Sequence, residues 1–216
     1  MYLFGLSPGM TIGIDASRAF LSNRTGIEEY SYRLIRQLRD ELVRESVVLY
    51  VRFGQASRID FPLPERWIVK ELRARKFWTQ WALAIEMIRN PPDVLLVPAH
   101  TVPWIHPKRT VVVVHGLEYE VCPEAYAARE RMLMRFSLRN SCRWASDIIA
   151  VSESTKKDLV KIYGVPREKI SVIYEGTGGE ESKINSRNFG SDSSIPMSKP
   201  YFLFIGRIET RKNVAR

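Results

Sequence analysis

The stretch "DVLLVPAHTVPWIHPKRTVVVVHG", residues 93–116, contains two near-continuous apolar runs, at 93–99 and 110–116. A strand that is buried on both faces has this pattern, which is typical of a parallel sheet covered by helices on either side. Successive parallel strands also need crossover connections, which are usually helical. We therefore expect the two runs to be central strands of an α/β domain.

The flanking sequence continues the alternation of apolar runs and amphipathic segments. Further strands are predicted at 11–16, 46–53, 66–72, 147–152 and 169–176, and helices at 27–43, 76–89, 123–144 and 152–164. The last of these helices opens on serine caps and closes on Gly164. Strands that alternate with helices predict a Rossmann-like, doubly wound parallel sheet.

The composition changes after the last of these strands, which indicates a boundary near residue 177. Residues 178–200 are rich in Gly, Ser, Asn and charge, without periodicity, and are interpreted as a flexible linker. An apolar strand then restarts, so we interpret 201–216 as the start of a second domain that is nearly absent. Residues 11–177 form the main domain, and 1–10 an N-terminal extension, because "MTIGID" from Met10 is a natural beginning for this fold.

Composition and charge limit the function classes. The chain has 216 residues, 45% of them hydrophobic, and a net charge of +9, which attracts nucleic acid, anionic lipid or phosphorylated small molecules. It has no zinc-finger spacing and no RNP-type aromatic motif, so we expect no nucleic acid partner. The sequence has no apolar run long enough to span a bilayer and no secretory signal pattern, and its two cysteines fit a reducing cytoplasm. We expect Cys142 to be a small buried apolar residue.

Ligands of open α/β sheets bind beyond the carboxyl ends of the strands, so residues at those positions are candidates for a site. Gly26 lies where a loop becomes a helix, which offers backbone N–H groups to a phosphate or sugar hydroxyl; an ordinary glycine turn explains it as well. His115 and His100 each follow a buried strand. Each is either a group that donates hydrogen bonds or transfers protons in a site, or a structural histidine. With only three histidines, the chain predicts no metal site.

Two predicted helices carry basic residues next to apolar ones. Arginine recurs at every fourth position of one helix: Arg131, Arg135, Arg139 and Arg143. Such a stripe is either a solvated face, which is the default, or a surface that docks on an anionic membrane or acceptor. In "RARKFWTQWALAIEMIR", 73–89, the mixture of Phe, Trp, Lys and Arg suits a lipid interface or, by default, a core helix whose charged ends reach water.

Taken together, these stretches resemble the N-terminal half of a glycosyltransferase of the family 4 type, within the GT-B fold. The similar stretches are "IGIDAS…TGIEEY", "DVLLVPAHTVP", "VVVVHGLEYEVCPEAY", "ASDIIAVSESTKKDLVKIYGVPREKISVIYEG" and "YFLFIGRIETRKN". The resemblance implies a retaining, hexosyltransferase-type enzyme that moves a sugar from a nucleoside-diphosphate sugar to an acceptor hydroxyl in glycan or glycolipid biosynthesis. It implies no metal or other cofactor.

The resemblance also implies roles for individual residues. His115 is the expected catalytic histidine beside the transferred sugar, and Gly26, Arg207 and Lys212 are expected to bind the donor phosphates, where a leaving group's charge needs stabilisation. We assign His100 to the acceptor, which is a glycan or a lipid-linked molecule. The expected location is cytoplasmic, with peripheral contact at the inner face of an anionic membrane.

Two departures from the family pattern qualify these expectations. Many relatives have His-Asp where this chain has His115-Gly116, which removes a neighbouring carboxylate. Most of the donor domain, with its acidic motif, is also missing, so we expect the chain alone to be inactive and cut from a longer enzyme by a biological, sequencing or cloning boundary. The alternative is a stand-alone acceptor-binding or membrane-docking module that acts with a separate donor-domain subunit.

Overall fold

The computed structural model describes residues 9–176, together with Gly206 and Ile208. The chain divides into two compact units, Met1–Tyr174 and Glu175–Arg216. The first unit is described below. The predicted linker, 178–200, and all but two residues of the predicted segment 201–216 lie outside the described residues, as do residues 1–8 of the predicted extension.

The core of the first unit is a seven-stranded sheet in the order β3-β2-β1-β4-β5-β6-β7. Its strands are β1 Thr11–Asp15, β2 Ser46–Arg52, β3 Trp67–Leu72, β4 Val94–Val97, β5 Arg109–Val114, β6 Asp147–Ala150 and β7 Ile170–Val172. All neighbouring pairs are parallel, and the order reverses at β1, which pairs with both β2 and β4. The predicted parallel α/β sheet is confirmed. Such a reversal is where open α/β sheets bind ligands.

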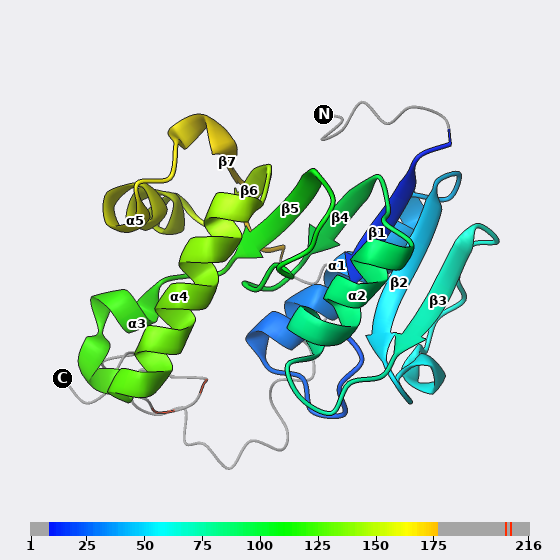
Figure 1. Ribbon diagram of the computed structural model, residues 1–216, viewed down its shortest axis with the longest axis horizontal. Coiled ribbons are helices and arrows are strands. Elements are labelled where there is room, and N and C mark those ends of the chain that lie inside the picture. Colours follow the sequence, from blue (N-terminus) through cyan, green and yellow to red (C-terminus); the bar gives the residue numbers. More distant parts are fainter. Residues whose placement is uncertain (1–8, 177–205, 207, 209–216) are drawn as a thin grey trace, which may run out of the picture. The chain divides into compact units, whose positions relative to one another are not determined.

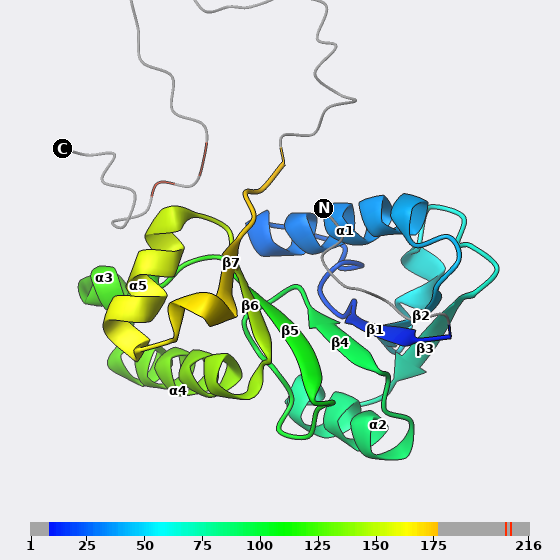
Figure 2. The same ribbon diagram turned by 90° about the horizontal axis from the view of Figure 1, so that it is seen from above.

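Helices cover both faces of the sheet, as predicted. The helices are α1 Gly26–Glu41, η2 Thr79–Leu83, which is a π-helix, and α2 Ala84–Arg89, α3 Glu118–Val121, α4 Ala128–Trp144 and α5 Glu153–Tyr163. Figures 1 and 2 show α1 on one face and α2 and α4 together on the other. Ile35 of α1 belongs to one apolar cluster with β1 and β2, whereas Leu83 of η2, Leu138 of α4 and Leu159 of α5 belong to a second cluster.

The helix ends follow from local sequence. Ser152 Oγ accepts a hydrogen bond from the backbone N–H of Thr155 at 3.1 Å, which caps α5. Gly164 ends α5 with a φ of 66°, a left-handed conformation that glycine adopts without steric strain. The predicted serine cap at the start of helix 152–164 and the predicted glycine at its end are therefore confirmed.

Two predicted helices are wrong in their bounds. The predicted helix at 123–144 begins only at Ala128, because Tyr126 and Ala127 are extended and the preceding turn, η3 Pro123–Ala125, is a 3-10 helix. The predicted helix at 76–89 contains the π-helical turn η2 before α2 begins, so its side chains do not follow one 3.6-residue period. Phe77, just before this helix, has a φ of 50°, which is unusual for a bulky residue.

Candidate functional site

The two predicted site histidines lie together at the carboxyl edge of the sheet. His100 follows β4 and His115 follows β5, and these strands are neighbours, so their rings stand 5.4 Å apart between centroids. Tyr30 of α1 contacts the His115 ring edge-to-face at 4.7 Å. Because Tyr30 lies about one helical turn after Gly26, the structure brings Gly26, His100 and His115 to one edge of the domain.

The backbone fixes the orientation of His115. Its Nε2 atom lies 2.9 Å from the carbonyl oxygen of Pro98. A carbonyl oxygen only accepts, so Nε2 donates and carries the proton of the ring. When the ring is neutral, this hydrogen bond selects the tautomer with the proton on Nε2 and the lone pair on Nδ1. Hydrogen bonds to the backbone set the tautomer of catalytic histidines in the same way.

His100 is a neutral group at ordinary pH. Burial lowers its pKa to about 3, and the charges of His115 and Arg18 act in the same direction. An uncharged imidazole offers one donor and one acceptor, which suits a sugar hydroxyl better than an anion. This property is compatible with the predicted acceptor role of His100, which stays a prediction.

Gly26 is the first residue of α1, and it faces open space. A Cβ atom added there would meet no atom within 4 Å, so the backbone is accessible to a ligand. The first turn of α1 also holds a carboxylate of its own: Glu28 accepts from the backbone N–H of Thr25 at 3.2 Å and pairs with Arg18 at 3.0 Å. An incoming phosphate would share this helix end with Glu28, and the donor-phosphate role of Gly26 remains untested.

A carboxylate does lie beside position 116, although residue 116 is glycine. Glu118, the first residue of α3, folds back so that a Cβ at Gly116 would stand 2.9 Å from its carboxyl carbon and from both carboxyl oxygens. The absence of an acidic side chain at 116 therefore does not leave this edge without a carboxylate. A side chain at 116 and the present position of Glu118 exclude each other.

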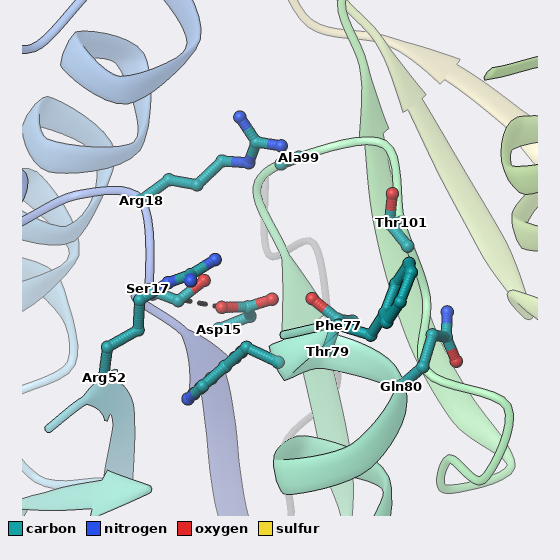
Figure 3. Close-up of a pocket in the computed structure, with 10 residues that line it drawn as sticks. Asp15, Ser17, Arg18, Arg52, Phe77, Thr79, Gln80, Ala99 and Thr101 are labelled. Carbon is teal, nitrogen blue, oxygen red and sulfur yellow. Dashed lines mark hydrogen bonds between the residues drawn. The ribbon is translucent and has the colours of Figure 1, made fainter. Parts of the chain in front are cut away.

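A hollow of about 200 Å³ opens next to the histidines, where β1, β2 and β4 end. Figure 3 shows its lining, with Asp15 at the centre and Ser17 on one side. The lining residues are Asp15, Ser17, Arg18, Arg52, Phe77, Trp78, Thr79, Gln80, Ala99 and Thr101. Ala99 and Thr101 flank His100 in the chain, so the hollow and the histidine pair form one continuous edge.

The pKa of Asp15 in this hollow is raised, because burial outweighs the groups that stabilise its carboxylate. Burial raises the pKa of Asp15, while hydrogen bonds from Ser17, whose backbone N–H donates at 3.0 Å, and the charges of Arg18 and Arg52 lower it. The side chain of Arg18 is about half exposed and reaches from the loop after β1, and Arg52 is the exposed last residue of β2. Two guanidinium groups and one carboxylate thus face the same small volume.

Sequence reasoning missed this hollow. Asp15, Arg18 and Arg52 are not among the predicted site residues, because they come from separate segments and share no motif. Phe77 is predicted only as part of a segment suited to a lipid interface or a core helix. The rule that ligands bind beyond strand ends points to Asp15 and Arg52, which end the first and second strands.

Other predicted features have these outcomes. Arg207 and Lys212 lie outside the described residues. Cys142 is buried, as predicted, and burial raises the pKa of its thiol to about 12. Within residues 9–176, no three His, Cys, Asp or Glu side chains gather as metal ligands would, and no helix is both long and apolar enough to cross a membrane.

Comparison with known proteins gives consistent matches. The family model described as Glycosyltransferase Family 4 matches residues 24–177. The chain is 27% identical over 115 residues to the O-antigen chain mannosyltransferase RfbU of Salmonella typhimurium, which covers 53% of this chain and 29% of that protein. It is 28% identical over 109 residues to the uncharacterized glycosyltransferase MJ1607 of Methanocaldococcus jannaschii, which covers 47% of this chain and 27% of that protein.

A solved structure shows the same fold. The structure of WaaG, a glycosyltransferase involved in lipopolysaccharide biosynthesis, matches with a TM-score of 0.51 at 10% identity, over 76% of this chain and 44% of that chain. The chain thus spans less than half of the solved structure, and each sequence alignment spans less than a third of the relative.

Proposed function

The chain belongs to glycosyltransferase family 4, and on this premise we propose that the protein of which it is part transfers a sugar from a nucleoside-diphosphate sugar to an acceptor hydroxyl in glycan or glycolipid biosynthesis. One observation supports this most directly. The family match extends over 24–177, and within it His100, His115 and the start of α1 lie at the edge where the sheet order reverses.

The proposed reaction proceeds with retention at the anomeric carbon and needs no metal. The bond from the anomeric carbon to the phosphate oxygen breaks, the bond to the acceptor oxygen forms on the same face, and the acceptor's proton leaves with the nucleoside diphosphate. His115 contacts the transferred sugar, His100 the acceptor, and Gly26, Arg207 and Lys212 stabilise the leaving diphosphate. The name of RfbU, a mannosyltransferase, supports a hexose as the transferred group.

We propose that the 216-residue chain alone does not turn over donor. Arg207 and Lys212 fall within its last sixteen residues, and a shaped pyrophosphate site needs the rest of a donor-binding sheet around them. The proposed location is cytoplasmic, with peripheral contact at the inner face of the membrane. The two cysteines, neither in a disulfide, are compatible with a reducing compartment.

The test begins with the coding DNA beyond Arg216. If the reading frame continues, the whole frame is expressed and assayed for nucleoside-diphosphate release with a panel of UDP-, GDP- and dTDP-sugars, with membrane extract as the acceptor source. His115→Ala should lower turnover roughly 100-fold or more, as loss of one positioned catalytic group does. His106→Ala is the matched control, because His106 lies in the loop before β5, stacked on Trp144, and should retain near-normal turnover.

The outcomes separate the alternatives. Turnover by the whole frame, unaffected by EDTA and lost in His115→Ala, supports the proposal, and NMR of the product decides the anomeric configuration. Full turnover in His115→Ala contradicts the catalytic role. Robust turnover by the 216-residue chain contradicts its proposed inactivity. A stop codon after Arg216, with a donor-domain protein that co-purifies, favours the two-subunit alternative.

A further inference from the structure

The helical segment formed by η2 and α2 is apolar on both sides: Leu83 and Met87 are buried in the core, while other apolar side chains face outward. Trp81 of η2 and Ile85 and Ile88 of α2 are 58%, 41% and 61% exposed. The same helix buries a carboxylate: Glu86 is 5% exposed and pairs with Lys70 of β3 at 2.5 Å. The outer side of an ordinary surface helix is polar, so the exposed apolar side chains of this segment suit a contact with something other than water.

The exposed apolar surface continues beyond α2. Phe77, directly before the helix, is 74% exposed, whereas its neighbour Trp78 is buried. Trp104 and Ile105, in the connection between β4 and β5, are 56% and 45% exposed. Gln80 joins this connection to η2, because its amide donates to the Val102 carbonyl at 3.0 Å and accepts from the Trp104 N–H at 2.8 Å. These six side chains, Phe77, Trp81, Ile85, Ile88, Trp104 and Ile105, are called the tryptophan face below.

Helix α4 extends the same side of the domain. The backbone N–H of Val102 donates to Ser141 of α4 at 2.9 Å, so the β4–β5 connection lies against both α4 and η2. Figure 1 shows α2 and α4 on the near side of the sheet. On α4, Met132, Leu133 and Phe136 are each more than half exposed, among the arginines of the predicted stripe. Apolar and basic groups therefore share the outer side of one helical layer.

The charge on this side is strongly positive. In residues 73–89, 104–109 and 128–144, Lys and Arg far outnumber the two acidic residues, Glu86 and Glu130. Within this set Arg135 of α4 is paired with Glu120 of the neighbouring α3. Glu86 is turned inward against Lys70. In a two-fold dimer this positive surface would meet a copy of itself, which is unfavourable because a two-fold interface uses the same patch on both subunits.

We propose that the tryptophan face and the exposed side of α4 bind an anionic lipid bilayer. Tryptophan and phenylalanine enter the boundary between headgroups and acyl chains, while Lys and Arg contact anionic headgroups. Phe77 and Gln80 also line the hollow at the carboxyl edge, so the surface is continuous with the candidate acceptor site. The bilayer contact itself needs no turnover; only its use to supply a lipid-linked acceptor rests on the proposed function.

The test is vesicle flotation with the purified 216-residue chain, using phosphatidylcholine vesicles and vesicles with about one-third phosphatidylglycerol. The double variant Trp81→Ser with Trp104→Ser should bind both kinds of vesicle at least about tenfold more weakly, because each loses a large apolar contact. Both positions are more than half exposed, so folding should be preserved, and thermal unfolding of each variant checks this. Val43→Ser, an exposed apolar residue next to α1, is the matched control and should not change binding.

The charge contribution is tested separately. Each basic residue near an anionic surface adds roughly fivefold to partitioning, so Arg129→Gln with Arg143→Gln should weaken binding to anionic vesicles about 25-fold and leave binding to neutral vesicles unchanged. Arg36→Gln with Arg44→Gln, on the α1 side, is the charge-matched control.

Equal flotation of wild type and the tryptophan variant would overturn the proposal. So would a lipid-independent dimer in analytical ultracentrifugation that the tryptophan variant dissociates, because a second copy would then cover the surface. Failure of the proposed function is distinguishable: vesicle binding with no sugar transfer by the whole reading frame would contradict only the enzyme activity. Sugar transfer without vesicle binding would contradict only the bilayer surface.

Discussion

The substitution Gly13→Ala tests the packing at the centre of the sheet. Gly13 lies in the middle of β1, opposite Val48 of β2 and Leu95 of β4. A Cβ atom there would stand 2.7 Å from Pro92 Cγ and 2.8 Å from Cε2 of the Tyr50 ring, which is 1% exposed. Both distances are well below ordinary carbon–carbon contact, roughly 3.5–4.0 Å, so these side chains or the strand must move.

The expected magnitude comes from two opposing effects. Replacing glycine by alanine stabilises a protein by about 0.4–1 kcal/mol where the native backbone suits alanine, because the unfolded chain loses freedom. Overpacking a well-packed core destabilises it by about 1–3 kcal/mol. Because Pro92 and Tyr50 are buried with little room to retreat, the clash should win, and we expect a net loss of about 1–2 kcal/mol.

Thermal unfolding followed by circular dichroism measures this loss. For a chain of this size, 1 kcal/mol shifts Tm by about 2–4 °C, so Gly13→Ala should lower Tm by about 2–8 °C. Gly26→Ala is the matched control, because a Cβ there meets no atom within 4 Å, and alanine in a helix should keep or raise Tm. An unchanged or higher Tm for Gly13→Ala would refute the packing described for β1.

Two further predictions concern acid sensitivity and helix capping. Burial holds the pKa of His100 near 3 in the folded chain, whereas the unfolded value is near 6.5, so between these values only the unfolded state binds the proton. The free energy of unfolding should therefore fall as pH drops from about 6.5 towards 3, by up to about 1.4 kcal/mol per pH unit. Urea titrations of His100→Asn should show a shallower decline of this free energy with pH. Ser152→Ala removes the cap of α5 and should destabilise the chain by about 0.5–2 kcal/mol, whereas Ser152→Asp, which also caps, should restore the urea midpoint; equal midpoints for Ser152→Ala and wild type would contradict the capping role.

The parallel sheet was predictable because its central strands are apolar on both faces. Residues 93–99 and 110–116 contain β4 and β5, and the serine and glycine at the ends of α5 have local preferences that tertiary packing did not override. The sequence also placed His100 and His115 each after a buried strand. Their contact was not predicted, because it depends on β4 and β5 being neighbours in the sheet.

The features that the sequence did not predict depend on which side of a helix faces the core and on contacts between distant segments. A helical period of 3.6 residues does not say which of Phe77 and Trp78 is buried when the next turn is the π-helix Thr79–Leu83. The start of α4 at Ala128 depends on the extended backbone at Tyr126 and Ala127, although Pro123 is an acceptable first helical residue. Asp15, Arg18 and Arg52 meet only through the order of the strands, which one sequence does not state.

The two hydrogen bonds of Gln80 have a consequence for acceptor choice. They join η2, at the rim of the hollow, to the connection that carries Trp104. If Trp104 rests at the headgroup level of a bilayer, the hollow is held at a set height above the lipid. An acceptor would then be selected by the length of the spacer between its lipid and its reactive hydroxyl, as well as by the chemistry of its sugar.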